Sequence, residues 1–225
     1  MTDMTNIAQK IYEGIAKIRK QTNSDCEVFV RLSSRSPKDA IYHLEEFPGL
    51  YTQKLQELEN QEDLFSKLHA FYKASTGVMS VSSGVKATEL MRKSSRIQGD
   101  LKVCLDAGET MNLVIREFVQ YPVKNELRGF VHNGVFTALT QYNNLAFFPD
   151  HLGTKNVVEQ KVKKLMQQFI RAMKDVLKSF IVDIVLDNQG KAWIVEVNPF
   201  GELAGSCLFG WSKDRYGVSS WNFIL

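Results

Sequence analysis

The sequence predicts an α+β fold in which antiparallel β-hairpins are combined with amphipathic helices. One hairpin is indicated where Asn133-Gly134 separates two alternating runs, and a second where the turn cluster 187–190 separates two apolar runs. Apolar residues recur at helical spacing near the start of the chain and again in 157–180. Together these patterns predict helices and antiparallel strands in one chain.

The composition is that of a globular protein. Hydrophobic residues make up 44% and charged residues 24% of the 225 residues, which allows one large domain or two lobes. The net charge of +3 is too small to indicate a nucleic-acid partner. Scattered Cys26, Cys104 and Cys207 favour a reducing compartment, and no apolar run suits a signal peptide or a membrane span. We therefore expect a soluble, cytoplasmic monomer that binds neither nucleic acid nor membrane.

A loop rich in serine and arginine joins an early strand to a helix. Residues 27–31 form the expected strand, after a first helix that ends near 21–24. Ser36 as N-cap, Pro37 at the first helical position and Asp39 beyond it resemble a capping box. Arg31, Arg35 and Lys38 would bring positive charge to backbone donors and hydroxyls, a combination that suits a phosphate group. An ordinary strand-to-helix connection with surface arginines explains the same residues equally well.

The middle of the chain is predicted to be mainly helical. Residues 51–72 are mostly helical, with an inner face of leucines and Phe65, and two further helices open at Ser83 and at Ser94 or Ser95. The second of these carries an apolar stripe, and a short strand is possible at 78–81. The inner face of 51–72 is predicted to consist of Leu55, Leu58, Leu64, Phe65 and Leu68, and the stripe of Ile97, Leu101, Cys104 and Leu105.

The strand 113–119 carries Arg116 and Glu117 in an apolar setting, and the hairpin 126–142 follows it. A two-residue turn fixes the pairing of that hairpin, so its partners can be counted outward from the turn. Polar and apolar side chains then lie on opposite faces of the hairpin. The polar face either faces solvent or binds a ligand. The count pairs His132 with Val135, Phe130 with Thr137, Arg128 with Leu139 and Glu126 with Gln141, and it places Glu126, Arg128 and Gln141 opposite a packed face of Leu127, Val131, Phe136 and Ala138.

The hairpin 180–201 carries the most informative polar residues. A loop over 143–156 and a long amphipathic helix over 157–180 lead into it. Glu196 and Asn198 point to the same face of the second strand, and Pro199 ends the ladder. A carboxylate and an amide oxygen at this spacing suit Mg²⁺ bound partly through nucleotide phosphates. Whether Asp183 shares their face depends on a register that the turn leaves open, and the alternative is a solvated edge hairpin.

Cations and hard oxygens on separate strands are the two halves of a nucleoside-triphosphate site. Arg31, Arg116 and Arg128 supply the cations, and Asp183, Glu196 and Asn198 supply the oxygens. The chain contains neither a Walker P-loop nor a GxGxxG motif. A nucleotide would therefore have to be bound by a different fold.

Motifs in the chain resemble the cell division cycle protein 123 family. The resemblance runs from about Tyr12 to Trp211 and implies an ATP-grasp fold, a single domain with approximate lobes 1–112 and 113–225 whose antiparallel sheets clasp the nucleotide. It also implies an ATP-dependent chaperone that joins the alpha and gamma subunits of translation initiation factor 2. The motifs are FVRLSSRSPKDA (29–40), LVIREFV (113–119), ELRGFVHNGVFTALTQY (126–142), FIVDIVLDNQGKAWIVEVNPFGE (180–202) and LFGW (208–211).

The resemblance assigns roles to individual residues, with ATP and Mg²⁺ as the expected ligands. Arg31 and Arg128 would hold the phosphates, and Ser33 and Ser34 would line the same loop as Arg31. The backbone of Arg116, Glu117, Phe118 and Val119 would meet the adenine. Asp183, Glu196 and Asn198 would bind magnesium. The gamma subunit is the expected partner.

The resemblance leaves open whether the protein is an enzyme. An ATP-grasp ligase or kinase acting on an unidentified substrate is the alternative, and it would need an acceptor pocket and commonly a general base. His43, His69, His132 and His151 form no recognisable catalytic constellation in the sequence. No catalytic residue is therefore assigned.

Overall fold

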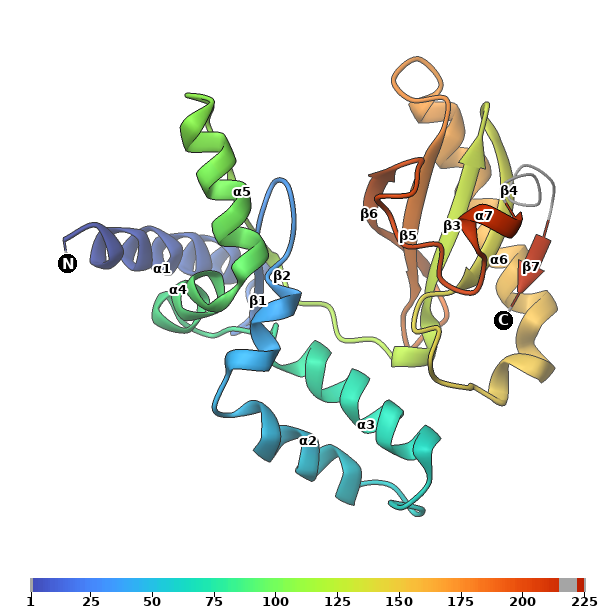
Figure 1. The fold of residues 1–225 in the computed structure, drawn as a ribbon, viewed down its shortest axis with the longest axis horizontal. Coiled ribbons are helices and arrows are strands. Elements are labelled where there is room, and N and C mark those ends of the chain that lie inside the picture. The colour runs from blue at the N-terminus through green and yellow to red at the C-terminus, as the bar shows by residue number, and fades with distance from the viewer. Residues whose placement is uncertain (1, 215–221, 225) are drawn as a thin grey trace. The chain divides into compact units, whose positions relative to one another are not determined.

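The computed structural model describes residues 2–214 and 222–224 as two compact units, Met1–Val119 and Gln120–Leu225 (Figure 1). Helices and antiparallel strands occur in both units, which confirms the α+β class. The first unit extends beyond the approximate boundary after residue 112, because the strand Leu113–Glu117 pairs with the strand Val28–Leu32 near the N-terminus.

The first unit packs helices against a two-stranded antiparallel sheet. Ile11 and Ile15 of the first helix meet Val28 and Val30 of the sheet in one buried cluster, as their alternate and helical spacings require. The strand expected at 78–81 is reduced to a single bridge between Val28 and Val81. The elements are α1 Thr2–Thr22, β1 Val28–Leu32, η1 Lys38–His43, α2 Phe47–Gln56, α3 Leu64–Gly77, α4 Gly84–Lys93, α5 Ser95–Asp106 and β2 Leu113–Glu117.

The segment 51–72 is mostly helical as predicted, but the helical residues belong to two helices and part of the predicted inner face is exposed. The chain forms α2 and α3, which pack against each other, and α3 begins where Asp63 accepts a hydrogen bond from the Ser66 amide at 3.0 Å. Leu64 and Phe65 are 65% and 46% exposed. The polar stretch before Asp63 ends the first helix, and a second helix starts after the N-cap Asp63. The buried face of this second helix therefore differs from the one predicted for the segment. The apolar stripe predicted for the helix that is now α5 was half right. Ile97 and Cys104 are buried, but Leu101 and Leu105 are exposed.

The capping box predicted at Ser36 was also wrong. The segment after Pro37 is the 3₁₀-helix η1, and no side chain caps its start. Asp39 instead accepts hydrogen bonds at the start of α5, from Ser94 Oγ at 2.5 Å, Ser95 Oγ at 3.0 Å and the Arg96 amide at 3.1 Å. Partial burial opposes the charge, but these donors lower the pKa of Asp39 below its ordinary value. The carboxylate therefore stabilises a helix that is distant in sequence.

We predict that Asp39→Ala lowers the free energy of unfolding by about 1–2 kcal/mol, because helix N-cap donors lose their acceptor. Ser36→Ala is the matched control, since Ser36 makes no capping bond, and we expect a change within about 0.5 kcal/mol. Chemical denaturation followed by far-UV circular dichroism measures both. Equal losses in the two variants would contradict this assignment of the cap.

The second unit contains a five-stranded sheet with strand order β6-β5-β3-β4-β7. In Figure 1, α6 lies behind this sheet and α7 in front of it. The face toward α6 carries the larger apolar cluster, whereas Phe130, Ala138 and Ile181 pack with Phe209 on the opposite face. The elements are η2 Val123–Asn125, β3 Glu126–His132, β4 Val135–Gln141, α6 Asp150–Met173, β5 Phe180–Leu186, β6 Ala192–Pro199, α7 Trp211–Asp214 and β7 Asn222–Ile224.

The boundaries predicted for the long helix were displaced at both ends. α6 begins at Asp150, directly after Pro149, and tolerates Gly153 at an exposed position in its first turns. It ends at Met173, so Val176 and Leu177 lie in the connection to β5 and are 70% and 40% exposed. The chain must reverse there to enter the sheet, which apolar periodicity alone does not reveal.

The hairpin of β3 and β4 forms around Asn133-Gly134 as predicted, but a β-bulge changes its register. His132 still faces Val135, whereas beyond the bulge Phe130 faces Ala138 and Arg128 faces Thr140. Thr137 is the extra residue, so Phe136 and Ala138 lie on opposite faces instead of the same one. Gln141 consequently faces Leu127 and does not join Glu126 and Arg128.

Candidate functional site

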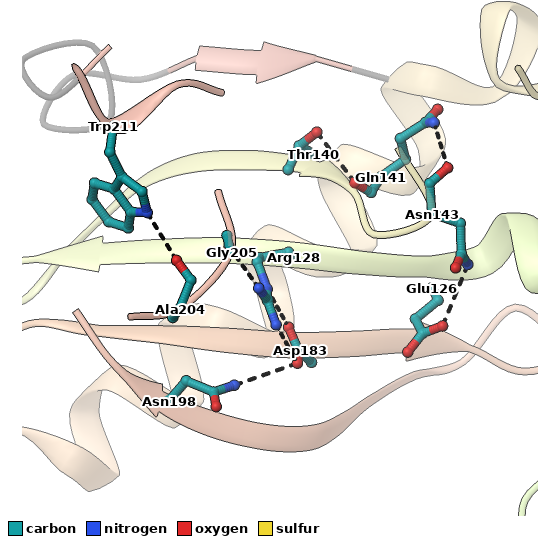
Figure 2. Close-up of polar contacts among 10 residues, drawn as sticks. All are labelled: Glu126, Arg128, Thr140, Gln141, Asn143, Asp183, Asn198, Ala204, Gly205 and Trp211. Atoms are coloured by element: carbon teal, nitrogen blue, oxygen red, sulfur yellow. Dashed lines mark hydrogen bonds and ion pairs between the residues drawn. The ribbon is translucent and has the colours of Figure 1, made fainter. Parts of the chain in front are cut away.

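A polar cluster crosses the face of the second sheet that lies away from α6. Arg128 on β3 is opposite Asp183 on β5, and Asp183 is in turn opposite Glu196 on β6. Asn198 lies two residues beyond Glu196 on the same face. Figure 2 shows Asn198 and Arg128 beside Asp183. The register that the sequence left open therefore brings Asp183 together with Glu196 and Asn198.

Arg128 and Asp183 form a buried, bidentate ion pair. Arg128 Nε donates to Asp183 Oδ1 at 2.7 Å and Nη2 donates to Oδ2 at 2.9 Å, and the residues are 7% and 3% exposed. Burial disfavours the charged guanidinium, but the hydrogen bonds and charge of Asp183 outweigh it and raise the pKa of Arg128. A solvated edge hairpin is excluded as an explanation for Asp183.

The guanidinium has two further contacts that the sequence did not reveal. Nη1 donates to the Gly205 carbonyl at 2.6 Å, and the guanidinium carbon lies 4.8 Å from the centre of the Tyr142 ring. Tyr142 follows β4 directly, so its approach to Arg128 depends on the bulged register. Gly205 is distant in sequence and has no side chain, and no sequence signal marks its carbonyl.

The donor set around Asp183 fits a hard cation. Asn198 Nδ2 approaches Asp183 Oδ2 at 3.4 Å, and Glu196 is half-buried on the edge strand. Two carboxylates and an amide oxygen are ligands that Mg²⁺ accepts when phosphate oxygens complete its shell. Within the described residues no group of three or more His, Cys, Asp or Glu side chains could hold a metal ion alone. The magnesium role of these residues therefore stays a prediction that requires a phosphate-bearing ligand.

A second β-bulge lies beside the cluster. Asp183 faces Glu196, but Ile184 faces Ile194, so Val195 is the extra residue of β6. Bulges of this kind redirect side chains and are frequent next to active sites. Here the bulge allows Glu196 to lie on the polar face while Ile194 packs in the cluster toward α6.

The remaining predicted residues lie in the first unit. Arg31 is opposite Val114 and Phe29 is opposite Arg116, which places both arginines on the face of the β1 and β2 sheet that points away from the buried cluster. Arg31 Nε donates to the Leu32 carbonyl at 2.9 Å, and Arg116 lies over the Phe29 ring at 4.9 Å. Ser33 and Ser34 are exposed. The two arginines are thus diagonal neighbours on one surface.

The backbone of residues 116–119 pairs with the β1 side of the sheet along one edge only. The Phe118 amide donates to the Glu27 carbonyl at 2.9 Å, and the Ser33 amide donates to the Asn112 carbonyl at 2.8 Å. Hydrogen-bonded and non-bonded pairs alternate along an antiparallel ladder, so the backbone groups of Glu117 and Val119 point away from β1. These are the groups that could meet a planar heterocycle at the strand edge, whereas the Phe118 amide is already bonded.

A separate cleft of about 210 Å³ lies beside α6. Lys124, His151, Lys161 and Leu186 are among its lining residues, and His151 Nε2 donates to the Lys124 carbonyl at 2.7 Å. Burial lowers the pKa of His151 below its ordinary value. Leu186 packs in the apolar cluster that faces α6, which places this cleft on the opposite side of the sheet from Arg128 and Asp183.

Comparison with known proteins identifies the family. The family model D123 matches residues 2–215. The chain belongs to the D123 family. This confirms the resemblance to the cell division cycle protein 123 family that the motifs indicated.

Curated relatives of this D123 family member carry the name translation initiation factor eIF2 assembly protein. The chain is 28% identical over 120 residues to the protein of Xenopus tropicalis, 26% identical over 189 residues to that of Xenopus laevis, and 28% identical over 104 residues to that of Danio rerio. The alignments cover 52%, 76% and 45% of this chain but only 34%, 54% and 29% of the relatives. The chain therefore matches about a third to a half of each relative's length.

Solved structures support the D123 fold assignment. The structure of Cdc123 from Schizosaccharomyces pombe superposes with a TM-score of 0.69 at 18% identity, covering 96% of this chain and 76% of that one. A C-terminally truncated form of the same protein gives a TM-score of 0.69, covering 98% of this chain and 77% of that one. The ATP-grasp-like fold that was expected is thereby confirmed. None of the described helices has the length and apolar character needed to cross a bilayer.

Proposed function

We propose that this D123 family member binds Mg·ATP and assists the assembly of translation initiation factor 2. The observation that supports nucleotide binding best is the alignment of Arg128, Asp183 and Glu196 on one face of the sheet. A buried arginine can grip phosphate bidentately, and the neighbouring oxygens suit the metal that accompanies it. The names of the curated relatives support the assembly role.

We propose the following division of roles among the residues. Asp183, Glu196 and Asn198 hold Mg²⁺, which would neutralise phosphate charge when bound. Arg31 and Arg128 contact the phosphates, with Ser33 and Ser34 beside Arg31. Arg116 lies near the nucleotide. The strand edge at Glu117, Phe118 and Val119 meets the adenine, with the outward-facing backbone groups of Glu117 and Val119 on either side of Phe118.

The proposed partner is the gamma subunit of translation initiation factor 2, to which the alpha subunit would be joined. We propose that the protein acts in the cytoplasm as a monomer. In this role bound nucleotide orders a protein-binding surface, and turnover of ATP is not required. An ATP-grasp ligase or kinase would instead consume ATP in the presence of an acceptor.

Isothermal titration of the protein with ATP, with and without Mg²⁺, tests nucleotide binding. We expect magnesium-dependent binding that weakens at least tenfold, about 1.4 kcal/mol, in Glu196→Gln/Asn198→Ala. This double variant leaves the ion pair of Arg128 and Asp183 intact, and Glu202→Gln on the exposed turn that follows is the matched control. Wild-type protein that binds no ATP would contradict the proposal.

The assembly role is tested by mixing the protein with purified gamma subunit. We expect binding that requires Mg·ATP and is lost in Glu196→Gln/Asn198→Ala. Equal binding with and without nucleotide would contradict the ATP-dependent mechanism. Sustained ADP release that depends on an acceptor would favour the ligase or kinase instead.

A further inference from the structure

Arg128 connects the polar cluster to a segment outside the sheet. One edge of its guanidinium, formed by Nε and Nη2, donates two hydrogen bonds to Asp183, and Nη1 donates to the carbonyl of Gly205. Gly205 belongs to the stretch Phe200–Trp211, which follows β6 and which we call the capping segment. Figure 2 shows Arg128 between Asp183 and Gly205. One cation thus supplies hydrogen bonds to both a proposed metal ligand and a loop backbone.

The capping segment is anchored at its end and tethered by Arg128 in its middle. Phe209 and Trp211 pack on Phe130, at ring separations of 5.5 Å and 6.1 Å. Trp211 Nε1 donates to the Ala204 carbonyl at 2.8 Å. Leu203, two residues before Gly205, is fully exposed, so the middle of the segment lies at the surface.

We propose that Arg128, through its contacts with Asp183 and Gly205, couples nucleotide binding to the capping segment. This inference rests on the proposed function, because it concerns the same phosphate and metal site. In the structure Arg128 holds Asp183 and Gly205. When Mg·ATP is bound, Arg128 turns to phosphate, Asp183 turns to the metal, and the Gly205 carbonyl loses its donor.

The exchange follows from the number of contacts that each group can make. Asp183 already accepts two short hydrogen bonds from Arg128 and a longer one from Asn198, which leaves only about one of the roughly four acceptor positions of its carboxylate open. A metal ion that binds both oxygens must therefore displace the guanidinium. A buried guanidinium cannot leave its carboxylate without another anion, because an unpaired buried charge is strongly unfavourable. Phosphate supplies that anion, whereas Mg²⁺ alone does not. The hydrogen bond from Arg128 to the Gly205 carbonyl should therefore break when Mg·ATP binds, but not when Mg²⁺ is added alone.

Hydrogen exchange of backbone amides tests the coupling in the wild-type protein. Ala204 donates its amide to the Gly201 carbonyl at 3.0 Å, and Phe209 donates its amide to the Ser206 carbonyl at 3.2 Å, so both report on the capping segment. We expect both amides to exchange about tenfold faster when saturating Mg·ATP is added, because a hydrogen bond to a charged group is lost. Mg²⁺ alone should leave both rates unchanged.

Arg128→Lys tests the same step without nucleotide. Lysine keeps the positive charge beside Asp183. Its single ammonium group lacks the planar set of N–H donors with which arginine bonds Asp183 and the Gly205 carbonyl at the same time. We expect Ala204 and Phe209 to exchange about tenfold faster in this variant before any ligand is added. Arg171→Lys, at an exposed position on α6, is the matched control and should behave as wild type.

The failure of this inference can be told apart from failure of the proposed function. If titration shows that wild-type protein binds Mg·ATP but its Ala204 and Phe209 amides exchange at unchanged or slower rates, the coupling is wrong and nucleotide binding stands. Equal acceleration by Mg²⁺ alone would also overturn it, since phosphate would not be needed. Absence of ATP binding would contradict the proposed function itself.

Discussion

Asp183→Ala is expected to destabilise the second unit by about 3–5 kcal/mol, because it leaves the Arg128 guanidinium buried without its carboxylate. Arg128 is 7% exposed, and Asp183 is the carboxylate that accepts two of its hydrogen bonds, at 2.7 Å and 2.9 Å. The Gly205 carbonyl and the Tyr142 ring remain near the cation but carry no full negative charge. Urea denaturation followed by circular dichroism measures the loss.

The double variant Arg128→Met/Asp183→Leu is the control for this prediction. Removing both charges avoids an unpaired buried ion, and apolar side chains of similar volume are often tolerated at such sites. We expect it to be considerably more stable than Asp183→Ala while failing to bind Mg·ATP. A loss below about 1 kcal/mol in Asp183→Ala would show that water reaches the guanidinium and that the pair is not buried as described.

Phe130→Ala is expected to cost about 3–5 kcal/mol of stability, because a large and fully buried ring is removed. Its ring makes edge-to-face contacts with Phe200, Phe209 and Trp211 at 6.5, 5.5 and 6.1 Å, and it is 0% exposed. These contacts attach the capping segment to the sheet. Thermal and urea denaturation measure the change in stability.

Leu152→Ala is the matched control in the same unit. Leu152 lies in the first turns of α6 and is 75% exposed, so we expect a change within about 0.5 kcal/mol. Losses of similar size in the two variants would indicate that the aromatic cluster does not hold the capping segment. Near-UV circular dichroism should also change in Phe130→Ala, since the environment of Trp211 is altered.

The sequence by itself determined the hairpins and most of the helices of this protein. Asn133-Gly134 supports backbone conformations with positive φ at both residues, at 49° and 77°, which tight hairpin turns require. Ile11 and Ile15 are buried as their helical spacing predicted. Such features depend on neighbours in sequence, so local patterns were sufficient to predict them.

The candidate site was predictable as a set of residue types but not as an arrangement. Asp183, Glu196 and Asn198 stood out because charged and amide groups interrupt apolar strands, and the structure brings them together. Arg31 and Arg116 share one sheet face, which strand alternation could have shown once β1 was paired with β2. That pairing joins segments far apart in sequence, and no local pattern specifies it.

Only the tertiary structure decided the registers and the long-range polar contacts. A single extra residue, Thr137, moved Arg128 from opposite Leu139 to opposite Thr140, because one inserted residue reverses the alternation of every later side chain. Asp39 stabilises α5 and not its own helix, and Arg128 holds the Gly205 carbonyl. The geometry of these hydrogen bonds depends on how distant segments pack, and the spacing of residues along the chain does not contain that information.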